Sequence, residues 1–428
     1  MVSVAILLLL ALMALSIPVA ATLGLLGLSL DYLYSFLPLR LAIGEITWNV
    51  TTDFILFSIP LFVLLGEILL RSGIAERMYG AMTQWLSWLP GGLMHSNIGA
   101  CSLFAAVSGS SVATAATIGT VAVGEIDRHG YNENLFLGTI AAGGTLGILI
   151  PPSIPMIVYG ALTDTSIPKL YLAGFLPGFV LASLFMLTVI IACSVRPHWG
   201  GHKIASSWGA RLRSLPDLIP PLIIFLAVIG SIYAGLATPT ESAAIGVVIS
   251  LGLAAWRHRL SIAMLRDTIE GTMRTSAMIM GILIGAYFLN FVINSIGLAG
   301  KVTAIVTAAG LSPMATLVLI VGFYLVLGMF MESLSMMVAT VPIVTPVVAA
   351  LGFDKVWFGV LMMLLVETAL VTPPVGFNLF VVQGVRKRGQ IIDVIRGVWP
   401  FVVTLLVMIA LLIVFPQIAL LLPQRVPV

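Results

Sequence analysis

Two pairs of adjacent prolines interrupt apolar segments that are otherwise typical of membrane helices. Pro151 and Pro152 lie in LGILIPPSIPMIVYG, and Pro373 and Pro374 lie in LVTPPVGFNLFVVQG. A proline lacks a backbone N–H and clashes with the preceding turn, so the carbonyls before each pair lose their intrahelical donors. In hydrocarbon these carbonyls need other partners. The breaks therefore indicate sites where backbone oxygens can hold a small cation.

Each proline pair follows a cluster of small hydroxyl residues by a similar stretch of chain. The clusters are SGSS, ending at Ser111, and MESLS, which contains Ser333; each of these two serines precedes its proline pair by 40 positions. Neutral oxygens suit Na⁺, whereas a multivalent cation normally demands carboxylates. The N–H groups at half-helix N-termini favour an anionic substrate. Candidates for lining its cavity are Ser110, Pro151, Glu332, Ser333, Ser335, Pro373 and Asn378. In the alternative interpretation, the prolines are packing kinks and the serines bond back to helix carbonyls.

The composition places these segments in a membrane. Of the 428 residues, 60% are hydrophobic and 9% are charged, and the mean hydropathy is +1.15, which excludes an ordinary soluble domain. The N-terminus reads as a first span and not as a cleaved signal. Cys101 and Cys193 lie in apolar stretches and are interpreted as packing residues. The small net charge of +3 argues against nucleic acid as a partner.

An internal repeat organises the chain. Pro151 and Pro373 are 222 positions apart, and further marks keep nearly the same offset: Pro18 and Pro239, Gly24 and Gly246, Gly73 and Gly297, Pro90 and Pro313, and Ser111 and Ser333. Residues 1–213 and 214–428 are therefore predicted to be two copies of one fold within a single membrane unit. The expected fold class is an all-α polytopic membrane protein.

The distribution of basic residues predicts the orientation, because cytoplasmic loops are enriched in Lys and Arg. Of the 20 basic residues, the following are assigned to the cytoplasm: Arg71, Arg77, Arg128, Arg196, Lys203, Arg211, Arg213, Arg257, Arg259, Arg266, Arg274, Arg386, Lys387, Arg388 and Arg396. The others, assigned to the outside, are Arg40, Lys169, Lys301, Lys355 and Arg425. This assignment requires five crossings per half, so the second copy is inverted, and both termini are expected in the periplasm.

The expected crossings follow from the apolar runs. In the first half they are Val4–Ser16, Val19–Leu37, Thr52–Leu70, Asn134–Thr163 and Leu170–Val195. In the second half they are Leu218–Gly235, Thr240–Trp256, Thr275–Ile296, Trp357–Gly384 and Ile391–Leu422. The helices 134–163 and 357–384 are broken at the prolines. The stretches 92–125 and 314–351 are interpreted as re-entrant hairpins, opening to the cytoplasm and to the outside respectively, and 196–213 as a basic loop.

Three carboxylates lie in or beside apolar segments and are candidates for function. Glu332 either lines the substrate cavity or is a solvated tip residue. Glu241 follows Pro239 and reads as a charge near a helix N-terminus. Glu367 is either a structural partner or a proton site. The histidines form no metal-ligand cluster.

The stretches SGSSVATAATIG, GILIPPSIPMIVYG and LVTPPVGFNLFV resemble the signature segments of the large membrane subunit of tripartite ATP-independent periplasmic (TRAP) transporters, and the resemblance covers nearly the whole chain. It implies an elevator-type transporter of the bacterial inner membrane that takes up organic anions, such as dicarboxylates or sialic acid, by sodium symport. It also implies two partners on separate chains: a small four-helix membrane subunit and a periplasmic substrate-binding protein.

The resemblance further implies two or more sites for Na⁺ as the coupling ion. The first would use Ser108, Ser111, Gly147, Ile150 and Pro152. The second would use Gly328, Ala369, Thr372 and Val375. Ala369 departs from an expected glycine, a change that a carbonyl ligand tolerates.

Other classes of protein explain the pattern less well. A stand-alone divalent-anion:sodium symporter of the related elevator class shares the hairpins and broken helices but needs no binding protein. An intramembrane protease would require a serine–histidine pair or paired aspartates within spans, so no enzymatic activity is expected. A channel would not explain inverted discontinuous helices.

Overall fold

The computed structural model describes residues 1–15, 17–202, 206–308 and 310–426. Within these ranges every named element is a helix, and one isolated bridge joins Tyr131 and Gly200. The expectation of an all-α protein is confirmed for this part of the chain. The helices form two packing groups, referred to here as the outer and the inner group.

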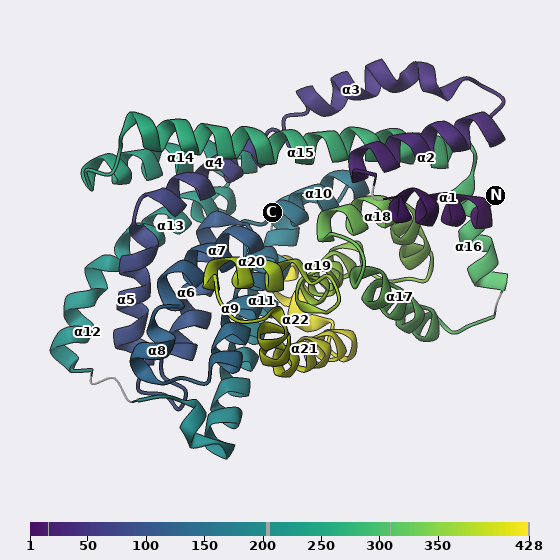
Figure 1. The fold of residues 1–428 in the computed structure, drawn as a ribbon. Helices are drawn as coiled ribbons and strands as arrows, with labels where there is room; N and C mark the ends of the chain where they lie inside the picture. Colours follow the sequence, from purple (N-terminus) through teal and green to yellow (C-terminus); the bar gives the residue numbers. More distant parts are fainter. Residues whose placement is uncertain (16, 203–205, 309, 427–428) are drawn as a thin grey trace.

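The outer group is built around the longest helix of the described chain, α15 (Ile262–Ser295). In Figure 1, α15 runs along one side of the molecule, and α2 and α3 lie beside it. Helix α4 packs on α14 and α15, and α13 packs on α14. The other members are α2 (Val19–Tyr34), α3 (Ile43–Thr52), α4 (Ser58–Arg71), α13 (Ile219–Tyr233) and α14 (Pro239–Trp256).

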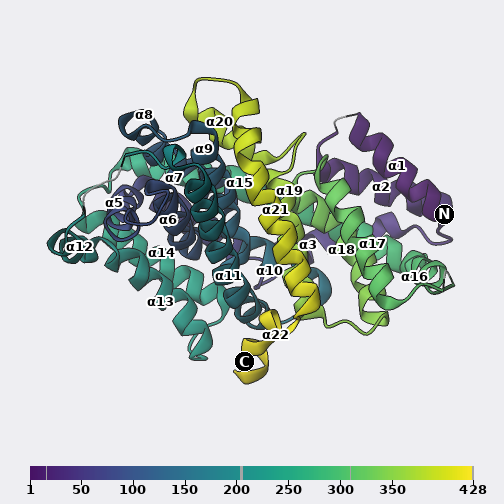
Figure 2. The ribbon, with the colours of Figure 1, turned by 90° about the horizontal axis from the view of Figure 1, so that it is seen from below.

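The inner group contains the proline-interrupted segments. Its core consists of α9 (Glu133–Leu149) and α19 (Lys355–Val371), which are buried over nearly their whole length. Figure 2 shows α21 crossing the middle of the molecule beside α9, α11 and α19. The remaining members are α6 (Leu93–Ser108), α7 (Ser111–Ala122), α10 (Ile154–Thr163), α11 (Ile167–Val195), α17 (Pro313–Gly328), α18 (Ser333–Ala350), α20 (Phe377–Arg386) and α21 (Ile391–Val414).

Close backbone packing holds α9 against α21. A Cβ added to Gly138 would collide with the Gly397 carbonyl, and one added to Gly397 would collide with the Asn134 carbonyl. Small residues permit such an approach between membrane helices, where dispersion and not hydrophobic burial drives association. Because α9 belongs to the first half and α21 to the second, the two halves share one core.

The helix boundaries keep the 222-residue offset of the sequence. Helices α7 and α18 begin at Ser111 and Ser333, and α9 and α19 follow Asn132 and Asp354. The Oδ1 atoms of Asn132 and Asp354 each accept a hydrogen bond from the backbone amide three residues further along the chain, at 3.0 and 2.9 Å. These side chains satisfy N–H groups that the first helical turn leaves free.

Several expected boundaries are wrong. The crossing expected at 52–70 starts only at Ser58, because Asp53 accepts hydrogen bonds from the amides of Ile55 and Leu56 and separates α3 from α4. Its counterpart, expected at 275–296, is the second part of the continuous helix α15. The last crossing ends at Val414, and a separate helix, α22 (Gln417–Arg425), follows Pro416.

The connecting segments also contain helices. The basic loop 196–213 includes the one-turn helix Pro197–Trp199 and most of α12 (Trp208–Ser214); residues 203–205 lie outside the described chain. The others are α1 (Val2–Ala14), α5 (Ile74–Leu86), α8 (Glu125–His129), α16 (Leu298–Ala308) and two 3₁₀ turns, Leu39–Ala42 and Leu215–Asp217.

Six helical segments of the described chain are long and apolar enough to cross a membrane, or up to eight if each of two bent pairs is one span. One of the six is α18, which the sequence assigns to a hairpin. Helices α1 and α2, with 13 and 16 residues, are short for a crossing. The number of ten crossings therefore stays a prediction.

Candidate functional site

The first break separates α9 from α10. Helix α9 ends at Leu149, and Ile150 is extended with ψ 121°, as expected for a residue that precedes proline. Helix α10 restarts at Ile154 with Ser153 as its cap, whose hydroxyl donates to the Ile148 carbonyl. Residues 150–153 are all buried.

The SGSS cluster lies directly against this break. It forms the junction between α6 and α7, where Gly109 adopts a left-handed φ of 62°. A Cβ on Gly109 would approach the Pro152 carbonyl oxygen to 2.7 Å, and one on Gly147 would approach the Ser110 oxygen to 2.8 Å. Glycine at both positions therefore lets the Pro152 carbonyl lie close to the tip and the Ser110 carbonyl lie close to α9.

The hydroxyls of the first tip have defined partners. Ser108 Oγ lies 3.2 Å from Thr114 Oγ1, which donates to the Ser110 carbonyl at 2.7 Å. Ser108 and Ser111 are buried, and Ser110 is half-buried. Thr114 escaped sequence reasoning because a threonine within an apolar helix usually bonds back to its own backbone.

Asn378 connects the first tip to the second half. Its Nδ2 donates to Ser111 Oγ at 2.9 Å and to the Ala141 carbonyl at 3.1 Å. Asn378 is fully buried in α20, directly after the second break. Two residues 267 positions apart thus form one polar contact between the halves.

The second break separates α19 from α20 and contacts the end of α17. The Val375 amide donates to the Met329 carbonyl at 3.3 Å, and Thr372 Oγ1 donates to the Thr368 carbonyl at 2.6 Å. A Cβ on Gly328 would lie 2.5 Å from the Cβ of Ala369. The methyl group of Ala369 therefore occupies space that a glycine at this position would leave open.

The MESLS cluster forms the start of α18. Glu332 is exposed, and its carboxylate accepts hydrogen bonds from the Leu334 and Ser335 amides at 3.1 and 2.9 Å and from Ser335 Oγ at 2.9 Å. Ser333 is buried. Of the two roles considered for Glu332, this geometry is that of a helix cap at the tip.

The two breaks differ in exposure. Pro151 and Pro152 are buried, whereas Pro373 is half-buried and Pro374 and Val375 are exposed. The first break therefore presents an enclosed set of neutral oxygens, with Gly109 and Gly147 beside it. Oxygens of this kind are ligands that suit a hard monovalent cation. The second set is similar in residue type and more accessible to water.

The other carboxylates take different positions. Glu241 forms a reciprocal capping box with Thr238 at the exposed start of α14, with both contacts of its Oε2 at 2.8 Å. Glu367 is fully buried in α19, and within the described chain neither of its oxygens has a hydrogen-bond partner. The prediction that Glu241 is a charge near a helix N-terminus is confirmed, whereas the two roles given for Glu367 stay predictions.

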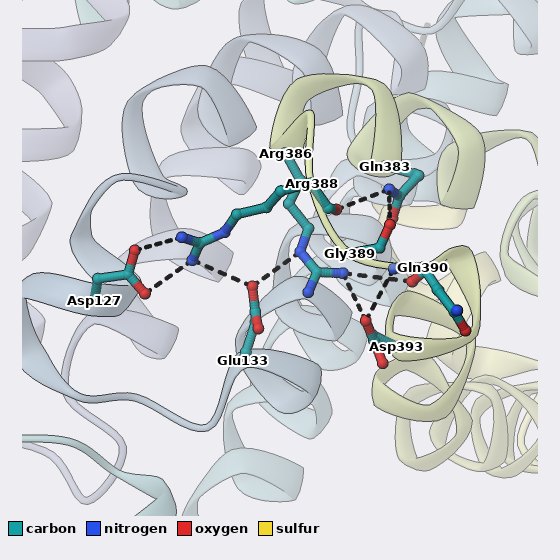
Figure 3. A network of polar contacts seen from close by, with 8 residues as sticks. All are labelled: Asp127, Glu133, Gln383, Arg386, Arg388, Gly389, Gln390 and Asp393. Atoms are coloured by element: carbon teal, nitrogen blue, oxygen red, sulfur yellow. Dashed lines mark hydrogen bonds and ion pairs between the residues drawn. The ribbon is translucent and has the colours of Figure 1, made fainter.

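A charged network at one end of the inner group joins the two halves (Figure 3). The buried Arg386 donates from Nε to Glu133 at 2.9 Å and from Nη1 to Asp393 at 3.0 Å. Arg388 pairs with Asp127 at 2.7 Å and with Glu133 at 3.3 Å. The hydrogen bond and charge of Arg388 lower the pKa of Asp127. The sequence could not reveal this network, because the partners that join the two halves are far apart in the chain, Glu133 and Arg386 by 253 positions and Asp127 and Arg388 by 261.

Comparison with known proteins identifies the family. The model of the "Tripartite ATP-independent periplasmic transporter, DctM component" matches residues 6–418. The chain belongs to this family. A relative from Pseudomonas aeruginosa, the C4-dicarboxylate TRAP transporter large permease protein DctM, is 34% identical over 379 residues, 88% of each chain. The sialic acid TRAP transporter large permease protein SiaM of Vibrio cholerae is 32% identical over 373 residues, 87% of each chain.

The resemblance stated from the signature segments is thus confirmed: the protein is the large membrane subunit of a TRAP transporter, and a multi-pass inner-membrane protein. Among solved structures, the Alcanivorax borkumensis YdaH transporter matches with a TM-score of 0.63 and 18% identity, covering 93% of this chain and 97% of that one. At this identity the match supports the fold alone. The family also implies a small membrane subunit and a periplasmic binding protein as partners of this TRAP large subunit.

Proposed function

We propose that this TRAP large subunit couples Na⁺ entry to the uptake of an organic anion. The contact between the SGSS tip and the α9–α10 break carries the proposal. There the Pro152 oxygen lies 2.7 Å from the position of a Cβ on Gly109, and the Ser110 oxygen lies 2.8 Å from that of a Cβ on Gly147. The buried hydroxyls of Ser108 and Ser111 lie at the same tip, and neutral oxygens of this kind are ligands that suit a monovalent cation.

The proposed ion ligands are those of the two breaks. The first set comprises Ser108, Ser111, Gly147, Ile150 and Pro152, and the second comprises Gly328, Ala369, Thr372 and Val375. A bound ion would add positive charge to the oxygen-rich tip and favour an anion beside it. The proposed substrate is a carboxylate, because relatives are named for C4-dicarboxylates and sialic acid.

The proposed mechanism is an elevator movement of the inner group against the outer group. It is supported by the division of the helices into these groups and by the shared core of α9, α19 and α21. At the boundary between the two groups, Gly66 of α4 faces Ser108. A Cβ added to Gly66 would lie 3.3 Å from the Ser108 carbonyl oxygen. The matching helix offsets support two repeats, and the charge asymmetry supports their inversion, with both termini in the periplasm.

The decisive measurement is initial uptake against Na⁺ concentration in proteoliposomes that contain the complete transporter. Ser108→Ala, Ser111→Ala and Thr372→Ala each remove a hydroxyl ligand, at a cost of about 1.5–3 kcal/mol, which corresponds to roughly ten- to a hundredfold weaker Na⁺ affinity. Ser335→Ala is the control, because Ser335 Oγ donates to Glu332 and lies outside both sets. If all three variants keep the wild-type half-saturating Na⁺ concentration and only the maximal rate falls, the assignment is wrong.

A second assay separates the tripartite mechanism from a stand-alone symporter. Uptake is expected to require the small membrane subunit, the periplasmic binding protein and an inward Na⁺ gradient, and to be indifferent to ATP. Full transport of free substrate by this chain alone would establish the stand-alone alternative.

A further inference from the structure

Asn378 lies in the first turn of α20, directly after the second break. Its side chain is fully buried, whereas the neighbouring Phe377 is exposed. The break before it is held at the end of α17 by the hydrogen bond from the Val375 amide to the Met329 carbonyl. The second half therefore carries the Asn378 amide group and directs it into the inner group.

The Asn378 side chain contacts two elements of the first half at once. Its Nδ2 donates to the Ala141 carbonyl of α9 at 3.1 Å and to Ser111 Oγ, at the start of α7, at 2.9 Å. Its Oδ1 lies 3.2 Å from the same Ser111 oxygen and can accept the hydroxyl proton. Either contact fixes the direction of the Ser111 hydroxyl and leaves a lone pair of its oxygen for another partner.

Close packing holds α7 against both neighbours of this contact, α9 and α20 (Figure 1). A Cβ added to Gly144 of α9 would lie 2.7 Å from the Cβ of Ala115. One added to Gly119 of α7 would lie 3.5 Å from Cγ1 of Val385 in α20. Because the backbone of α7 is fixed on both sides, the freedom that remains to Ser111 is the rotation of its side chain and hydroxyl. The Asn378 amide restricts that rotation.

We propose that Asn378 is a positioning residue, which orients the Ser111 hydroxyl toward a Na⁺ ion at the first break. The inference rests on the proposed function, in which Ser111 belongs to the first set of ion ligands. Asn378 does not itself contact the ion and acts through Ser111. The first set is therefore complete only when α20 of the second half is in place.

The test measures how two properties of the complete transporter depend on Na⁺ concentration. One is initial uptake in proteoliposomes, and the other is the thermal midpoint of the purified complex, which rises when an ion binds the folded state. Asn378→Leu keeps a side chain of similar size and removes its hydrogen bonds. In both measurements the half-saturating Na⁺ concentration is expected to rise about two- to tenfold, the equivalent of one neutral hydrogen bond. Both readouts concern only the folded fraction, so a reduced yield does not change them.

Asn97→Leu is the matched control. Asn97 is also fully buried in the inner group. Its Oδ1 accepts from the Tyr79 hydroxyl and its Nδ2 donates to Thr139 Oγ1, both at 2.8 Å. Neither partner belongs to an ion set, so the half-saturating Na⁺ concentration should stay at the wild-type value. An increase equal to that of Asn378→Leu would overturn the proposal.

A double variant shows whether Asn378 acts through Ser111. If it does, Ser111→Ala combined with Asn378→Leu has the half-saturating Na⁺ concentration of Ser111→Ala alone, within about twofold. Multiplication of the two single effects would overturn the proposal. So would a wild-type Na⁺ dependence of Asn378→Leu beside a weakened one of Ser111→Ala, and the proposed function would then stand. A wild-type Na⁺ dependence of Ser111→Ala would refute the first ion site itself and, with it, this role of Asn378.

Discussion

Replacing Arg386 with methionine should destabilise the protein more than any other single change in the network of Figure 3. The Arg386 side chain is 4% exposed and bonds to Glu133 and Asp393, whose side chains are 32% and 28% exposed. Methionine fills similar space but leaves Asp393 without this cation and Glu133 with only Arg388, at 3.3 Å.

The magnitude follows from burial. Breaking a fully buried ion pair costs about 3–5 kcal/mol. Because water reaches about a third of each carboxylate and screens it, the expected loss is about 2–3 kcal/mol of unfolding free energy. Arg388→Met is the matched control, since the Arg388 and Asp127 side chains are 49% and 66% exposed. That exposed pair should contribute little to the unfolding free energy, because water and salt screen it.

The assay is reversible unfolding of both variants in mixed detergent micelles, repeated at low and high salt. Salt should reduce the small effect of Arg388→Met and leave most of the Arg386→Met effect, because buried charges are screened less. Equal losses in the two variants, or a loss from Arg386→Met that salt abolishes, would refute the argument from burial.

Three further predictions concern the tip, the topology and pH. Gly147→Ala should abolish most Na⁺-driven uptake, because its Cβ would meet Ser110 backbone atoms at 2.8 Å, whereas Gly24→Ala meets nothing within 4 Å and should be tolerated; uptake by well-expressed variants checks this. A cysteine near Arg388 should be labelled only from the cytoplasm and one near Lys169 only from outside; labelling of both from one side would contradict the inverted repeat. The pKa of Asp127 is lowered in the folded protein, so the small stabilising effect of its ion pair should be complete above the ordinary aspartate pKa of about 3.9. The difference in thermal midpoint between wild type and Asp127→Asn should shrink as the pH falls through the lowered pKa. A difference that grows as the pH falls would contradict a stabilising ion pair at Asp127.

The helix breaks could be predicted from the sequence because they depend on local chemistry. Proline cannot continue a helix. The breaks accordingly lie after Leu149 and Val371. The SGSS cluster precedes its proline pair by 40 positions, and the Gly147 contacts show that this tip and break lie together.

The differences between the halves could not be predicted in this way. The repeat predicts matching helices, yet α3 and α4 are separated where α15 runs unbroken, because Asp53 turns the chain. Neither the burial of Pro151 nor the exposure of Pro374 follows from residue type, since both lie in the same motif.

The sequence by itself determined that this chain is an all-helical membrane protein, where two of its helices break, and which family it belongs to. Those properties reside in hydropathy, in proline geometry and in short motifs. Only the tertiary structure decided which distant side chains meet, such as Asn378 with Ser111 and Arg386 with Glu133. Such contacts depend on how α7, α9 and α20 pack, and packing brings together residues whose separation along the chain carries no local signal.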